Sequence, residues 1–90
     1  MRLRLEFTTE PFDLEEPPEH ARVARALVES APLDRVEVGP FGNTVEGGAG
    51  VVLEVVDRLL RTAPEVGAHR ISLQVTVLEG TVAAVEGEGL

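Results

Sequence analysis

The fold is decided by residues 35–63, RVEVGPFGNTVEGGAGVVLEVVDRLLRTA, in which a strand-like pattern gives way to a helical one. Residues 35–38 and 44–46 alternate between polar and apolar side chains, and the turn residues 39–43 separate them. This arrangement predicts a hairpin of two short strands. Residues 49–63 then place valines and leucines on one side and charged residues elsewhere, which predicts a strongly amphipathic helix.

The residues before this stretch predict one strand and one helix. Leu3, Leu5 and Phe7 alternate with polar residues, so a first strand is expected over residues 2–9. Residues 10–18 are rich in proline and acidic side chains and predict a connecting loop. Residues 19–31 repeat their apolar side chains at helical spacing and lie between prolines, as a helix does.

The residues after the stretch return the chain to the sheet. Pro64 is expected to break or kink the second helix near its end, and Gly67 to provide a left-handed cap. The perfect alternation of residues 70–77 predicts the last strand. We therefore expect one domain over residues 1–78, followed by a short flexible or edge-strand tail at residues 79–90.

The order strand, helix, strand, strand, helix, strand predicts an α+β fold, the ferredoxin-like βαββαβ sandwich. Its four-stranded antiparallel sheet carries both helices on one face and has the first and third strands in the middle. The alternation assigns these strand residues to the core: Leu3, Leu5, Phe7, Val36, Val38, Val45, Ile71, Leu73, Val75 and Val77. It assigns these to the open face: Arg4, Glu6, Thr8, Glu37, Thr44, Glu46, Ser72, Gln74 and Thr76.

Composition excludes several classes of function. The 90 residues carry a formal charge of −8, which repels nucleic acid and anionic membrane surfaces. The chain has no cysteine, so it has no disulfide framework, and its two histidines, His20 and His69, are expected to be exposed and not to bind metal. No signal-peptide pattern or membrane span is evident, and a cytoplasmic location is expected.

The open face suggests two kinds of chemistry. Glu6 and Glu46 resemble an acid/base pair, but no nucleophile, metal or oriented histidine accompanies them, so we expect no catalytic residues and no enzyme activity. The alternative is a solvated sheet face, which antiparallel sheets commonly have. The glycines at 47–50 precede a helix and could cradle an anion, yet a loop and helix cap is the simpler interpretation.

Three motifs resemble a known family. Gly39-Pro40-Phe41-Gly42, Glu46-Gly47 leading into a long helix, and Gly67-Ala68-His69-Arg70 opening the last strand resemble the small thiamine-binding protein family, formerly catalogued as of unknown function. The resemblance spans roughly residues 35–77. It implies a ferredoxin-like domain without enzyme activity or cofactor that assembles through its sheets into dimers or tetramers. In some members, the domain binds thiamine or its hydroxymethylpyrimidine portion.

The leading hypothesis from the sequence is a binding protein for thiamine or a related pyrimidine, held on the open sheet face or at a subunit interface. A carboxylate on that face suits a cationic ring, and hydroxyl and amide groups suit hydrogen bonds to the pyrimidine. The expected ligand-binding residues are Glu6, Thr8, Asn43, Thr44, Glu46 and Gln74. The alternative is a structural or regulatory module whose sheet only forms an oligomer.

Overall fold

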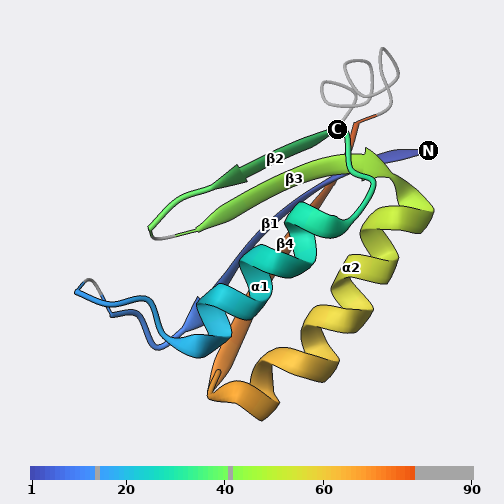
Figure 1. Cartoon of the computed structure of the whole chain (residues 1–90). Helices are drawn as coiled ribbons and strands as arrows, with labels where there is room; N and C mark the ends of the chain where they lie inside the picture. The colour runs from blue at the N-terminus through green and yellow to red at the C-terminus, as the bar shows by residue number, and fades with distance from the viewer. Residues whose placement is uncertain (14, 41, 79–90) are drawn as a thin grey trace, which may run out of the picture.

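The computed structural model describes residues 1–13, 15–40 and 42–78. These residues form one four-stranded antiparallel sheet with two helices on one of its faces (Figure 1). The elements are β1 (Arg2–Glu10), α1 (Glu19–Ser30), β2 (Arg35–Val38), β3 (Asn43–Gly48), α2 (Ala49–Thr62), the 3-10 helix η1 (Ala63–Val66) and β4 (Arg70–Val77). The ferredoxin-like α+β fold expected from the sequence is confirmed. The expected tail at residues 79–90 lies outside the described residues.

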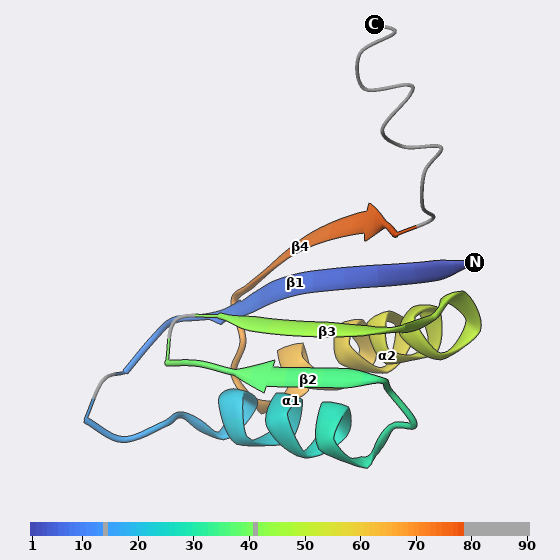
Figure 2. The ribbon, with the colours of Figure 1, turned by 90° about the horizontal axis from the view of Figure 1, so that it is seen from above.

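The strand order is β2-β3-β1-β4, so β1 and β3 are central as predicted. Figure 2 shows the strands side by side in the order β4, β1, β3 and β2. Leu5 faces Val45 on β3 and Val75 on β4, and Val45 faces Val36 on β2. Paired residues point to the same side of a sheet, so this register places the apolar set on the helix side.

Prolines and one glycine set the ends of the helices. Ala31 precedes Pro32 and has extended backbone angles, which ends α1. Pro64 cannot continue the hydrogen bonding of α2, and the chain passes into η1 at Ala63. Gly67 then takes the left-handed conformation, with φ of 108°, and turns the chain into β4 as the sequence predicted.

Strand β3 extends through Gly47 and Gly48, which were expected to follow it. Helix α2 therefore begins directly after Gly48. Gly47 is buried, and a Cβ atom there would lie 3.2 Å from the Leu33 side chain. The absence of a side chain therefore lets the connection before β2 approach the end of β3 closely.

The core lies between the helices and the middle of the sheet. Its most deeply buried members are Leu5, Val28, Val45, Val52, Val55 and Leu59. The predicted core was wrong at one edge, because Leu73, Val75 and Val77 of β4 are exposed although they point to the helix side. Val38, at the end of β2, is also exposed. Helix α2 packs against β1 and β3 and leaves this side of β4 uncovered.

His20 was expected to be exposed and is instead buried, with 2% of its surface accessible. It shares the inward side of α1 with Ala24 and Val28, at spacings of four residues. Its Nδ1 lies 2.8 Å from the Thr9 hydroxyl of β1. The first turn of α1 already packs against the sheet, so a position near the end of this helix is not exposed. His69 is exposed as expected.

Candidate functional site

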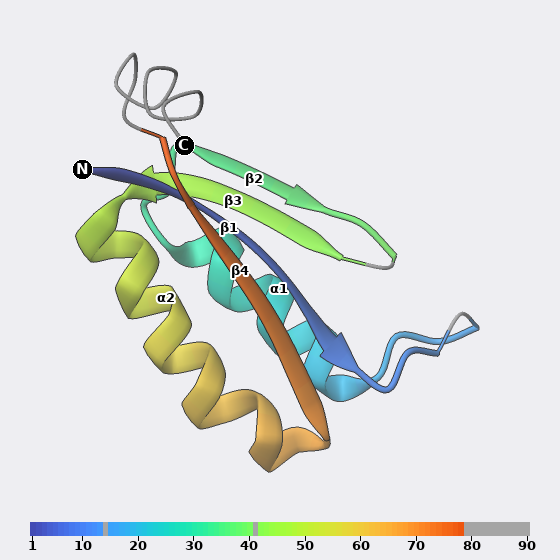
Figure 3. The same ribbon diagram turned by 180° about the vertical axis from the view of Figure 1, so that it is seen from behind.

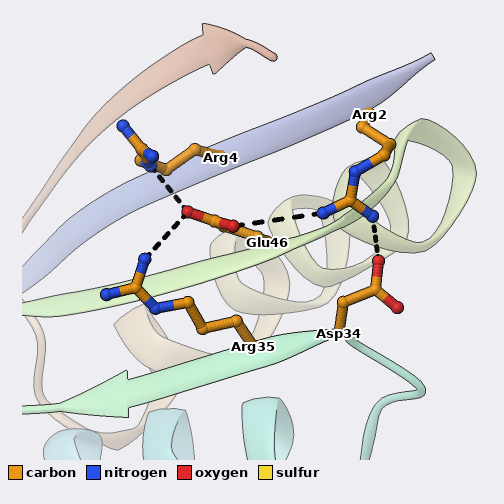
Figure 4. A network of polar contacts seen from close by, with 5 residues as sticks. All are labelled: Arg2, Arg4, Asp34, Arg35 and Glu46. Carbon is orange, nitrogen blue, oxygen red and sulfur yellow. Dashed lines mark hydrogen bonds and ion pairs between the residues drawn. The ribbon is translucent and has the colours of Figure 1, made fainter. Parts of the chain in front are cut away.

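The open face of the sheet contains a cluster of arginines around Glu46 (Figure 4). The Glu46 carboxylate accepts hydrogen bonds from Arg4 Nε at 2.9 Å and from Arg35 at 3.1 Å, and Arg2 lies 4.0 Å away. Arg2 also pairs with Asp34, and Arg35 with Glu37 at 2.6 Å. The register explains the cluster, because Arg4 and Arg35 both face Glu46, one from each neighbouring strand.

The cluster holds Glu46 in its charged form. Its side chain is 12% exposed. The hydrogen bond from Arg4 lowers the pKa of the Glu46 carboxyl below its usual value, and the opposing effect of burial does not cancel this. Conversely, the hydrogen bond to Glu37 raises the pKa of Arg35. The carboxylate that the sequence suggested as a ligand group is therefore already paired with arginines of the same chain.

Three of the other predicted site residues form a row across the sheet. Glu6 of β1 faces Thr44 of β3 on one side and Gln74 of β4 on the other. Thr8 follows on the same face, opposite Ser72, and its hydroxyl lies 3.3 Å from Glu10 Oε2. The sequence therefore placed these four residues correctly on one face, although Glu6 adjoins Thr44 and not Glu46.

Asn43 does not belong to that row. It faces Phe7 and Val38, so its side chain points to the helix side, where its Nδ2 is 3.5 Å from the Phe7 carbonyl oxygen. Asn43 was expected in the turn and near a ligand on the open face, but it begins β3, and its side chain points to the opposite face from Thr44 because adjacent strand residues point to opposite faces.

A pocket of about 390 Å³ lies at the end of the sheet. It is enclosed by the end of β1, the β1–α1 connection, the start of α1 and the β2–β3 hairpin, which lie at the same end of the molecule (Figure 3). Thr8 and Asn43 are the predicted site residues that line it, whereas Glu6, Thr44, Glu46 and Gln74 are not part of its lining. The structure thus divides the predicted site between a sheet face and a pocket.

Sequence reasoning missed most of the pocket lining. Phe12 and several prolines supply apolar surface, while Asp13, Arg22 and Arg25 supply charge. Arg22 donates to the Pro17 carbonyl at 2.7 Å, and Arg25 pairs with Glu29 at 3.0 Å. The available signal was the loop over residues 10–18, since a long connection in a small domain often carries a binding function.

No protein-family description matches the sequence, and no curated protein matches it. Among solved structures, the domain of unknown function DUF77 from Bacillus cereus is 24% identical with a TM-score of 0.65, over 89% of this chain and 79% of that one. A protein from Thermotoga maritima proposed to act in thiamine biosynthesis or salvage is 22% identical with a TM-score of 0.67, over the whole of both chains. A hypothetical protein from Methanocaldococcus jannaschii is 16% identical with a TM-score of 0.67, over 98% of this chain and 96% of that one. These similarities establish a shared fold.

No helix in the described part of the chain is both long enough and apolar enough to cross a membrane.

Proposed function

We propose that this protein binds a small heteroaromatic ligand without catalysing its reaction, and that the ligand is thiamine or its hydroxymethylpyrimidine portion. The observation that carries the proposal is the pocket of about 390 Å³ at the end of the sheet. Pockets of about 300–1,000 Å³ that combine apolar walls with a few polar groups are typical of small-molecule sites. The motif resemblance and the fold shared with the Thermotoga maritima protein support this class of ligand.

The pocket suits the pyrimidine portion better than the thiazolium ring. The Asn43 amide offers both a donor and an acceptor, which an aminopyrimidine edge requires. Phe12 and the neighbouring prolines provide apolar surface for a flat ring. Among charged side chains the pocket has one carboxylate, Asp13, beside two arginines, so it gives a cation no clear advantage.

The same geometry supports a role without catalysis. An acid/base pair of Glu6 and Glu46 requires one carboxyl that can hold a proton near neutral pH. Glu46 has a lowered pKa and two hydrogen-bonded arginines, and Glu6 adjoins Thr44. Such a carboxylate is poorly suited to act as a general acid.

Isothermal titration with hydroxymethylpyrimidine, thiamine and a pyrimidine lacking the amino group tests the proposal. We expect the first two to bind with similar affinity and the third to bind weakly. Asn43→Ala should weaken binding about 5- to 10-fold, the effect of one hydrogen bond of about 1 kcal/mol. Thr44→Val, a change at the adjacent residue on the open face, should leave the affinity unchanged.

If instead Thr44→Val weakens binding and Asn43→Ala leaves it unchanged, the ligand binds on the open face and the pocket is not the binding site. If the parent protein binds neither hydroxymethylpyrimidine nor thiamine, the proposed function is wrong. The alternative, a module that only forms an oligomer, would then be favoured.

A further inference from the structure

The pocket at the end of the sheet has two arginines on one wall. Arg22 and Arg25 are three residues apart on α1, so they share one side of the helix, and both line the pocket. Arg22 uses Nη1 to donate to the Pro17 carbonyl oxygen at 2.7 Å, and Arg25 uses Nε to donate to Glu29 at 3.0 Å. A guanidinium has five N–H donors. Each arginine therefore keeps donors that no described residue engages.

The start of α1 adds positive potential to the same wall. Residues 17, 18, 20 and 21 also line the pocket, so the amino-terminal end of the helix, which is the positive end of its dipole, borders it. The N-cap residue Pro18 makes no side-chain hydrogen bond to the first turn. Charge and helix dipole therefore both favour an anion at this wall.

The acidic residues of this region do not cancel that preference. Asp13 is the one carboxylate among the described residues of the lining, and its Oδ1 accepts the backbone N–H groups of Glu15 at 2.9 Å and Glu16 at 3.3 Å. Glu15, Glu16 and Glu19 are exposed and do not line the pocket. The lining thus has an excess of positive charge in a chain whose net charge is −8.

His20 gives an independent sign of a ligand. It lines the pocket and is 2% exposed, and its Nδ1 lies 2.8 Å from the Thr9 hydroxyl. Its Nε2 is buried and has no hydrogen-bond partner among the described residues. Buried polar atoms nearly always have a partner, so this nitrogen suits one that a ligand brings. When the Thr9 hydroxyl donates to Nδ1, Nε2 carries the proton and requires an acceptor.

We propose that the ligand of this pocket is a phosphate ester, and that Arg22 and Arg25 bind its phosphate. The inference rests on the proposed function and specifies its ligand, because the hydroxymethyl group of the pyrimidine is an alcohol to which a phosphate can be joined. A phosphomonoester has a charge of about −1.5 to −2 at pH 7 and three oxygens that accept hydrogen bonds. Guanidinium groups match these oxygens in pairs and bind them through charge-assisted hydrogen bonds.

Isothermal titration at pH 7.5 and low salt compares hydroxymethylpyrimidine with its phosphate ester. We expect the parent protein to bind the ester at least about 10-fold more tightly, the effect of one or more charge-assisted hydrogen bonds. Arg25→Gln should reduce this ratio to about 3-fold or less and leave the affinity for the uncharged alcohol unchanged. The double variant Arg22→Gln/Arg25→Gln should abolish the preference. Because Arg22 also holds the Pro17 carbonyl, Arg25→Gln alone decides the test if the double variant does not fold.

Arg61→Gln is the matched control. Arg61 pairs with Asp57 in an exposed ion pair on α2, as Arg25 pairs with Glu29 on α1, and each substitution removes one positive charge. Arg61→Gln should leave the ratio of the two affinities unchanged. An equal loss in Arg61→Gln and Arg25→Gln would show that the preference follows net charge, and it would overturn the assignment of the phosphate to the pocket.

The inference and the proposed function fail in different ways. If the parent protein binds the free pyrimidine as tightly as its ester, or more tightly, the phosphate site is wrong and the proposed function stands. If the parent protein binds none of the pyrimidine, its ester and thiamine, the proposed function is wrong and the inference fails with it.

Discussion

Glu46 is the residue whose role the structure changes most. The sequence placed it correctly on the open face and suggested that it attracts a ligand. The strand register shows why arginines contact the Glu46 carboxylate, because residues 4, 46 and 35 lie directly opposite one another on three neighbouring strands. A pattern along one strand gives the face of each residue but not its neighbours on other strands. The cluster could therefore not be predicted before the strands were aligned.

Glu46→Gln should lower the thermal midpoint at pH 7, because three arginines then share their side of the sheet with fewer carboxylates. A carboxyl with a lowered folded-state pKa stabilises the protein above its unfolded pKa and loses that effect as pH falls through the folded value. The difference in midpoint between parent and variant should be full at pH 7 and shrink below about pH 4.5.

Circular dichroism melts from pH 3 to pH 7 measure this difference. Glu54→Gln, which removes an exposed carboxylate paired with Arg58 on α2, is the control and should change the midpoint little at any pH. A Glu46→Gln midpoint equal to that of the parent at pH 7 would show that the cluster contributes nothing to stability.

At the scale of the helices and strands, local patterns in the sequence predicted the type, order and bounds of the elements almost completely. β4 begins one residue after His69, where the last strand was expected to start, and α1 and α2 each end within one residue of the prediction. The error lay in the burial of β4. Alternation shows which side chains share a face, but whether a helix lies against that part of the face depends on how α2 crosses the sheet. Leu73, Val75 and Val77 were therefore assigned to a core that does not extend beneath them.

Two Gly→Ala substitutions, at Gly67 and Gly50, should have opposite effects on the free energy of unfolding. Gly67→Ala forces an alanine to adopt φ of 108° and should destabilise the protein by about 1 kcal/mol, although its Cβ would meet no atom closer than 3.8 Å. Gly50→Ala places an alanine in α2 where the Cβ meets nothing within 4 Å, and it should stabilise the protein by about 0.5–1 kcal/mol. Urea unfolding followed by circular dichroism measures both, and equal signs would contradict this account.

At the scale of the whole molecule, net charge opposes the assembly through the sheets that the family resemblance implies. Two copies of a chain with a charge of −8 repel over long distances, and dissolved salt screens that repulsion with a Debye length of about 10 Å at 0.1 M. The uncharged segment of β4 contributes no ion pairs that salt would weaken.

Raising the salt concentration from about 20 to about 200 mM should therefore strengthen any dimer formed through uncharged parts of the sheet several-fold. Sedimentation equilibrium across this range measures the change. A parent dimer that dissociates as salt increases would indicate an interface held by ion pairs, such as one through the arginine cluster.

The short, charged β2 strand also limits how far assembly can proceed. A sheet in which both edges can pair with another chain can add a further copy at each end, and such an assembly grows without a fixed size. Among the described residues, only the β4 edge is free of charged side chains, from Ile71 to Val77, so pairing of two copies at that edge would leave a charged β2 at both ends of the enlarged sheet. Arg35 and Glu37 would thus act as terminators that keep a self-pairing sheet from becoming a filament.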